Sequence, residues 1–123
     1  MYLVRVFKNT WFTRFAKKEG ITDTELHEAV NRLEAGQPDA DLGGNVYKVR
    51  VARSGEGKSG GYRVIVFFKS EERTFFVYGF AKSDIGNINE KQLRNLKLAA
   101  KTIFKYSDKE LDERVKNGLF IEF

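Results

Sequence analysis

The sequence predicts a single α+β domain, residues 1–123, in which helices pack on one face of an antiparallel sheet of about four strands. A chain of 123 residues has the length of one ordinary domain, and its 41% hydrophobic residues suffice for a packed core. Segments with a helical hydrophobic period flank a central region with a period of two. Together these observations give the expected element order β-α-α-β-β-β-α.

One strand and two helices are expected before the central region. Residues 2–7 alternate well enough for a short strand, and Asn9 or Thr10 can then cap a helix. The apolar stripe of this helix consists of Trp11, Phe12 and Phe15. Thr22 stands three residues before a glutamate, which makes a capping box at the start of a second, amphipathic helix. Gly36 and the proline after it end that helix.

Three strands are expected in the central region. From Asn45 the hydrophobic period becomes two, which indicates a half-buried strand with one charged face. Residues 62–68 and 74–80 are two further apolar strands, separated by the polar turn KSEER. This pattern is typical of an antiparallel hairpin.

A third helix and a small appendix complete the expected fold. Asn89 and Gln92 form a capping box, and the helix that it opens runs to about Tyr106. A further capping box begins at Ser107. We expect the segment 107–123 to be an appendix made of a short helix and an apolar tail.

Composition excludes several classes of protein. The chain has no cysteine and one histidine, His27, so disulfides and zinc sites are not expected and His27 is read as a structural or exposed helix residue. No apolar run approaches the roughly 18 residues that cross a bilayer. Charge interrupts the start of the chain, where a signal peptide would be continuous. We therefore expect a cytoplasmic protein with no membrane contact, no metal and no cofactor.

Positive charge is concentrated in two parts of the chain. The net charge is +5, and the segment 45–63 holds 5 basic and 1 acidic residues while 82–106 holds 6 and 2. Localised basic charge favours a site for a polyanion such as nucleic acid. A solvated basic surface that serves only solubility is the alternative interpretation.

A glycine-rich loop at residues 54–61 imitates two nucleotide-binding motifs. Its glycines fit G-x-G-x-x-G, but a strand follows them where a dinucleotide site needs a helix. A P-loop would need glycine at position 52, where Ala52 stands. We interpret the loop as a basic hairpin connection in which Arg53 and Lys58 contact phosphates, and a plain flexible turn is the alternative.

Four cationic side chains are expected to converge at one rim of the sheet. Lys48 and Arg50 lie two apart on a strand, so they leave the same face roughly 7 Å apart. Arg63 begins the neighbouring strand and Lys82 follows the next one. RNA cleavage needs deprotonation of the 2′-OH, stabilisation of the phosphate's charge and protonation of the 5′-oxygen. Lysine can transfer protons where neighbouring cations favour its neutral form, and arginine suits charge stabilisation.

Further RNA contacts are predicted around this rim. The candidate stacking groups are Tyr62, Tyr78 and Phe80, although aromatic residues in strands more often belong to the core. In the second basic stretch the candidate contacts are Lys91 and Arg94.

The sequence resembles the RelE/ParE superfamily of type II toxins, in its HigB-like branch. The resemblance covers the β-α-α-β-β-β order and the segments VYKVRVARSGEGKSGGYRVIVFF, VYGFAKSDIGNINEKQL and SDKELDERVKNGLFIEF. It implies a metal-independent endoribonuclease, an mRNA interferase that cleaves mRNA in the A site of the 70S ribosome. It also implies a cognate antitoxin, through which the toxin binds operator DNA indirectly.

The resemblance also implies the roles of the cationic residues. The family's basic pair falls on Lys48 and Arg50, its arginine on Arg63 and its last basic residue on Lys82. Arg63 is expected to stabilise the transition state and Lys48 to act as general base, with Lys82 or Arg50 as the phosphate contacts. An exchange of these roles between Lys48, Arg50 and Lys82 is the alternative. Many relatives have a tyrosine shortly after the last position, but here the stretch reads SDIGN.

Two other functions fit the same fold. A ParE-like protein would inhibit DNA gyrase through protein contacts, without RNA chemistry. A non-catalytic module would bind RNA with strong salt dependence and cut nothing. The clustered cations of GKSGGYR argue against the gyrase alternative.

Overall fold

The structure is a computed structural model that describes residues 4–52, 61–81 and 88–123. In chain order its elements are β1 (Arg5–Asn9), α1 (Thr10–Glu19), α2 (Asp23–Glu34), β2 (Ala40–Gly43), β3 (Val46–Val51), β4 (Tyr62–Lys69), β5 (Arg73–Ala81), α3 (Glu90–Ile103), α4 (Asp108–Lys116) and β6 (Phe120–Glu122). The expected α+β class is confirmed. None of these helices is long and apolar enough to span a bilayer.

The sheet is larger than the sequence predicts. It has six strands among the described residues, in the order β2-β3-β4-β5-β1-β6, instead of about four. It is also not wholly antiparallel, because β1 runs parallel to β5 while every other neighbouring pair is antiparallel. The unpredicted strands β2 and β6 are four and three residues long, too short for a hydrophobic period to be recognised.

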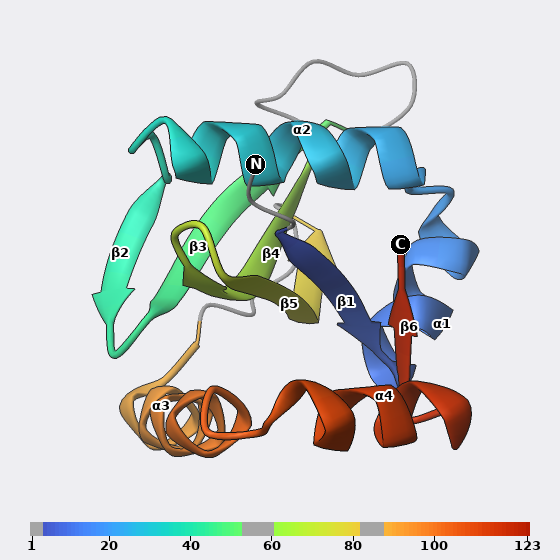
Figure 1. Cartoon of the computed structure of the whole chain (residues 1–123). Coiled ribbons are helices and arrows are strands. Elements are labelled where there is room, and N and C mark those ends of the chain that lie inside the picture. The colour runs from blue at the N-terminus through green and yellow to red at the C-terminus, as the bar shows by residue number, and fades with distance from the viewer. Residues whose placement is uncertain (1–3, 53–60, 82–87) are drawn as a thin grey trace.

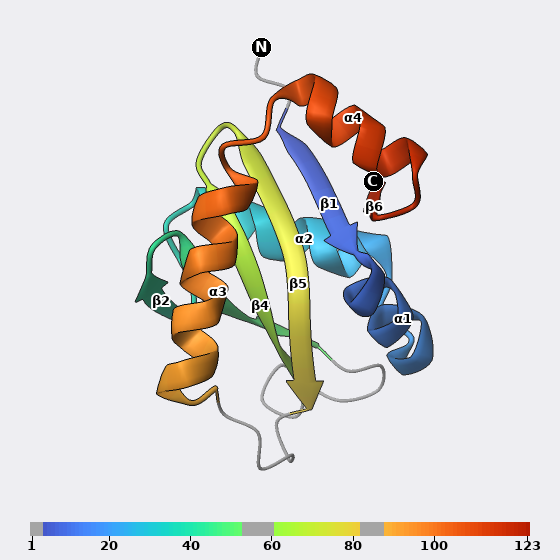
Figure 2. The same ribbon diagram turned by 90° about the horizontal axis from the view of Figure 1, so that it is seen from below.

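Helices cover both faces of the sheet, so the expectation of helices on one face is wrong. Figure 1 shows α2 on one side of the strands and α3 with α4 on the other, and Figure 2 shows the same arrangement from below. The cause lies in the central strands. All five residues from Val64 to Phe68 of β4 are buried, and a strand buried on both faces needs cover on both sides.

The chain changes from strand to helix beside β5. Asn9 ends β1 and caps α1, where its side chain accepts a 2.7 Å hydrogen bond from the backbone N–H of Phe12. The same side chain donates to the carbonyl of Val77, which ties the cap to β5. Gly79 then allows the helix to approach closely, because a Cβ there would lie 2.7 Å from the ring of Phe15.

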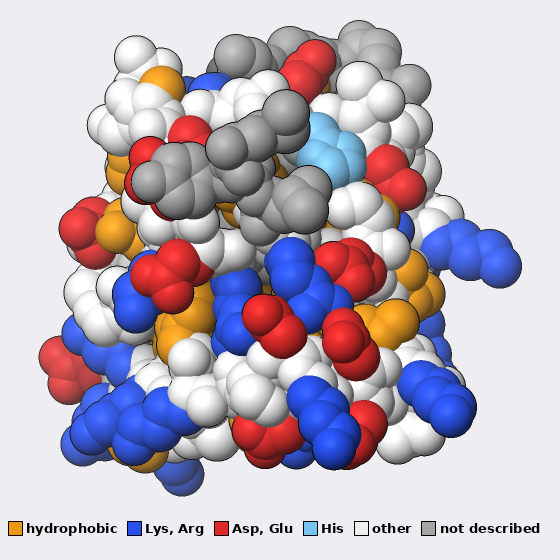
Figure 3. All heavy atoms as spheres, viewed as in Figure 1, with side chains coloured by type: hydrophobic (Ala, Val, Ile, Leu, Met, Phe, Trp, Pro, Cys, Tyr) orange, Lys and Arg blue, Asp and Glu red, His pale blue; other side chains and the backbone are white. Residues whose placement is uncertain are grey.

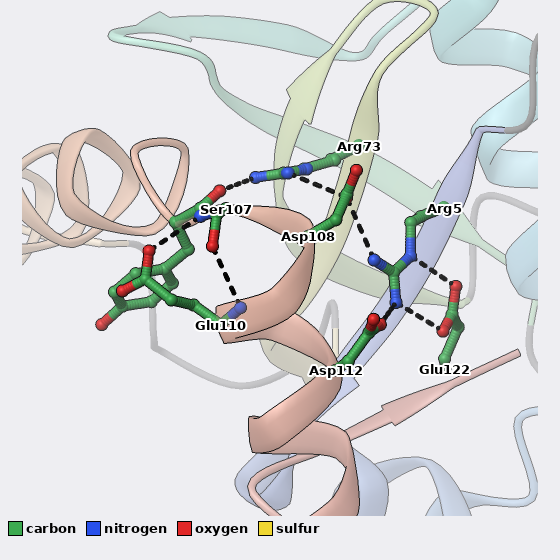
Figure 4. A network of polar contacts seen from close by, with 8 residues as sticks. Arg5, Arg73, Ser107, Asp108, Glu110, Asp112 and Glu122 are labelled. Atoms are coloured by element: carbon green, nitrogen blue, oxygen red, sulfur yellow. Dashed lines mark hydrogen bonds and ion pairs between the residues drawn. The ribbon is translucent and has the colours of Figure 1, made fainter.

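The C-terminal segment 107–123 is built into the sheet and the core. Leu111 of α4 is fully buried against the α3 side of the sheet, and β6 pairs with β1. Arg5 of β1 forms ion pairs with Asp108 at 3.1 Å, Asp112 at 2.6 Å and Glu122 at 2.9 Å (Figure 4). These bonds raise the pKa of Arg5, that to Glu122 most strongly, and one guanidinium thereby joins three elements.

Candidate functional site

The sheet register aligns the predicted cationic and aromatic residues in two neighbouring rows. Each row crosses β3, β4 and β5 in that order. The rows are Arg50, Arg63 and Phe80, and then Lys48, Ile65 and Tyr78. Ile65 belongs to the part of the core beneath α3 and α4, and side chains alternate along a strand. Both rows therefore lie on the α3 side of the sheet.

Arg63 carries an atom whose burial the fold does not explain. Its Nη1 is buried and, within the described part of the chain, has no hydrogen-bond partner. Its cross-strand neighbour is Arg50, another cation. Like charges directly opposite one another destabilise a sheet, and a buried donor without a partner adds to that cost. An anion bound between the two guanidinium groups would relieve both.

Arg50 is held in place by an acidic residue that the sequence analysis missed. Its Nε lies 3.1 Å from Asp39 Oδ1, and its backbone N–H donates to the other oxygen of the same carboxylate. Asp39 precedes β2, an unpredicted strand, so no sequence pattern marked it. The side chain of Arg50 remains 45% exposed, so it can still contact a ligand while Asp39 neutralises part of its charge.

Lys48 lies two residues before Arg50, at about 7 Å along β3. It is half-buried and faces Ile65 across the strand pair. Among the described residues it forms no ion pair, in contrast to Arg50. Its ammonium group is therefore not neutralised by a carboxylate of that part of the chain.

The three predicted stacking residues divide between the two faces. Tyr78 and Phe80 lie on the cationic face, with ring centroids 6.2 Å apart. Tyr62 is 2% exposed and belongs to the core beneath α1 and α2, where its hydroxyl donates to Glu19 Oε1 at 2.8 Å. The prediction that Tyr62 stacks on RNA is therefore wrong, because its strand position turns the ring to the opposite face.

An exposed tryptophan from α1 joins the aromatic group. The ring of Trp11 lies 4.6 Å from that of Tyr78 and 5.2 Å from that of Phe15, and 44% of Trp11 is exposed. The sequence indicated Trp11 as part of the apolar stripe of a helix. It gave no sign that β5 would lie beside that stripe, because the contact depends on where β1 ends.

Basic side chains also lie on α3. Lys91 and Arg94 are exposed in its first turns, and Lys97 lies over the turn between β2 and β3. In Figure 3, Lys and Arg side chains gather at the lower left, over α3. The first turns of α3 lie beside Tyr78 of the cationic face, since Gln92 and Asn95 line the same hollow as that ring. The remaining predicted contacts, Arg53, Lys58 and Lys82, lie outside the described residues.

The described residues contain no cluster of three or more His, Cys, Asp or Glu side chains that could hold a metal ion. His27 lies on α2, where its ring contacts that of Phe123 at 5.0 Å.

A comparison with protein families gives one match of nearly full length. The family model described as the RelE toxin of the RelE/RelB toxin-antitoxin system matches residues 4–123. The match covers every described strand and helix, including the C-terminal segment. It confirms the expected toxin superfamily, and the HigB-like branch stays a prediction.

Proposed function

The chain belongs to the RelE toxin family, and from this premise we propose that it is a metal-independent endoribonuclease that cleaves mRNA in the ribosomal A site. As a toxin of a toxin-antitoxin system it has an antitoxin partner. The proposal adds the reaction, the substrate and the residues that act.

The Arg50–Arg63 pair is the observation that carries this proposal. Two cations face each other across β3 and β4, and Nη1 of Arg63 is buried without a partner in the described chain. A guanidinium is planar, and two of its N–H groups can donate parallel hydrogen bonds to two oxygens of one phosphate. A phosphate bound between the two guanidinium groups would satisfy the buried donor and reduce the repulsion between them.

The reaction assigns a separate task to each cation. Lys48 acts as the general base that takes the proton of the ribose 2′-OH, and the 2′-oxygen attacks the adjacent phosphorus. Arg63 stabilises the negative charge that grows on the phosphate oxygens, with Arg50 held beside it by Asp39. The bond to the 5′-oxygen breaks and this oxygen takes up a proton from water, which leaves a cyclic 2′,3′-phosphate. Lys82 stays a predicted phosphate contact near this step.

Aromatic and helical groups extend the substrate contact. Tyr78 and Phe80 offer rings beside the arginine pair, and bases stack on such rings irrespective of their identity. Lys91 and Arg94 of α3 supply further positive charge for RNA of the mRNA or the ribosome. The antitoxin inhibits either by covering the cationic rim or by docking elsewhere and blocking entry to the 70S ribosome, and through it the toxin binds operator DNA indirectly.

The test is to incubate the protein with translating ribosomes and map new mRNA 5′ ends by sequencing. We expect ends within codons of the A site for the parent protein, and none for Arg63→Ala. Inhibition of DNA supercoiling without any new mRNA end would instead support the gyrase alternative. Ribosome binding without cleavage by the parent would support the non-catalytic module.

A further inference from the structure

A solvent-accessible hollow lies beside the cationic face, between β5 and the first turns of α3. Its volume is about 280 Å³. The residues that line it are Val77, Tyr78, Ile88, Gln92, Asn95 and Leu96. Binding sites for small organic groups begin at roughly 300 Å³ and combine apolar walls with a few polar groups. The hollow has this composition on a small scale, with one aromatic ring, aliphatic side chains and two amides.

The hollow is close to the arginine pair. Tyr78, in its wall, occupies the row next to that of Arg63, and diagonal neighbours on adjacent strands lie roughly 7–8 Å apart. A nucleotide spans such a distance between its phosphate and its base. A phosphate bound at Arg63 therefore brings an attached base within reach of the hollow.

The two amides are suited to the edge of a base. Gln92 accepts the N-cap hydrogen bond from the backbone of Asn89 at 3.0 Å, so its carbonyl is fixed in orientation. Asn95 is exposed, and its side chain makes no hydrogen bond within the described part of the chain. An amide offers both a donor and an acceptor, and Asn and Gln pair with bases through two such bonds.

We propose that this hollow holds one base of the RNA, stacked on Tyr78, and that Asn95 and Gln92 bind its edge. The inference rests on the proposed function and names the base contact of the same site. A base is favoured over an apolar side chain of a protein partner because the lining contains amides and an aromatic ring and lies beside unneutralised cations. The hollow would then determine which nucleotide is placed for cleavage.

The decisive experiment compares cleavage preferences with translating ribosomes. Asn95→Ala should still cut, but its discrimination between bases at one position near the cut should fall by roughly ten- to a hundredfold. The matched control is Asn31→Ala, an exposed helical asparagine of α2, and it should keep the parent's preference. If Asn95→Ala keeps that preference while Arg63→Ala abolishes cutting, the base-binding inference is wrong and the proposed function stands. If the parent cuts no mRNA, both fail.

Trp11 provides an independent measurement. It is the chain's one tryptophan, and its ring contacts Tyr78, so a base stacked on Tyr78 should change its fluorescence. The probe is a short 2′-O-methyl RNA, which cannot be cleaved because its 2′-oxygen is blocked. It is used as a series of oligonucleotides, each with one abasic position. One member should bind roughly tenfold more weakly and leave the emission unchanged. An equal emission change across the whole series would overturn the inference.

Discussion

The two arginines of the cationic face differ in their surroundings, and we propose separate roles for them on this ground. Asp39 neutralises part of the charge of Arg50 and accepts a hydrogen bond from its backbone N–H. In contrast, Nη1 of Arg63 is buried and has no hydrogen-bond partner in the described part of the chain. An arginine with a buried, unpaired N–H group contributes little to the stability of the fold, and it is available to bind an anionic ligand. The sequence placed both residues at strand positions, but Asp39 could not be predicted, because only the pairing of β2 with β3 brings it to the site.

We expect Arg63→Ala to lose mRNA cleavage by a hundredfold or more, since removal of one preorganised donor at the reacting group typically costs about 3 kcal/mol in the barrier. The melting temperature should stay the same or rise, because the repulsion from Arg50 and the unpaired buried donor both disappear. Cleavage assays and thermal unfolding measure the two effects.

Arg63→Lys should recover only part of the activity, because lysine keeps the charge but lacks the planar fork. The control Glu28→Ala, an exposed change on α2, should cleave like the parent. Full activity of Arg63→Ala with an intact fold would contradict the assignment of Arg63.

At the scale of elements, the sequence predicts those features that local interactions determine. The predicted capping boxes are confirmed at all three helix starts, Thr22, Asn89 and Ser107, since each depends on a residue only three positions away. The strands β2 and β6 escaped prediction because long-range pairing forms them. The parallel contact of β1 with β5 is equally non-local, and it brings Trp11 to Tyr78.

The close approach of α1 to β5 makes Gly79 sensitive to substitution. A Cβ at Gly79 would lie 2.7 Å from the ring of Phe15, which also packs against the rings of Trp11 and Tyr62. We expect Gly79→Ala to lower the free energy of unfolding by about 1–3 kcal/mol. Urea unfolding followed by Trp11 fluorescence measures this change.

The smaller ring-free variant Phe15→Leu provides the matching test. The double variant Phe15→Leu with Gly79→Ala should lose less free energy of unfolding than the sum of the two single variants, because leucine leaves space for the new methyl group. Strict additivity would show that the contact between Gly79 and Phe15 is not the cause.

The stability that the ion pairs of Asp108 give to the packing of α4 should depend on pH. The pKa of Asp108 lies below its ordinary value, because Arg5 and then Arg73 donate hydrogen bonds to the carboxylate (Figure 4). Its stabilising contribution is fully present above the unfolded-state pKa of about 3.9 and is lost as the pH falls through the lower folded-state value.

We therefore expect Asp108→Asn to be less stable than the parent near neutral pH, with a difference that narrows below about pH 4. Chemical unfolding at a series of pH values measures it. Glu113→Gln, an exposed change on the same helix, should follow the parent throughout. A constant difference between Asp108→Asn and the parent at all pH values would rule out this linkage.

For the whole molecule, the two basic stretches of the sequence lie on the same side of the sheet. The basic part of 45–63 supplies Lys48, Arg50 and Arg63, and that of 82–106 supplies Lys91 and Arg94 on α3. The sequence could not show that the two parts share a face, since it did not reveal that the helices divide between the two sides of the sheet. Because α3 lies on the same side of the sheet as these residues (Figure 1), we propose that the two stretches bind a polyanion together.

This arrangement predicts how binding responds to salt. Each phosphate contact on single-stranded RNA adds about 0.7 to the slope of log affinity against log salt. Arg63→Ala should therefore lower the slope for a 2′-O-methyl RNA by about 0.7, and the double change Lys91→Ala with Arg94→Ala by up to about 1.4. Fluorescence anisotropy across a salt series measures the slopes.

The control Lys69→Ala removes the same charge at the opposite end of β4, beside Glu72, and should leave the slope unchanged. If Lys69→Ala reduced it as much as Arg63→Ala does, net charge and not this surface would determine RNA binding.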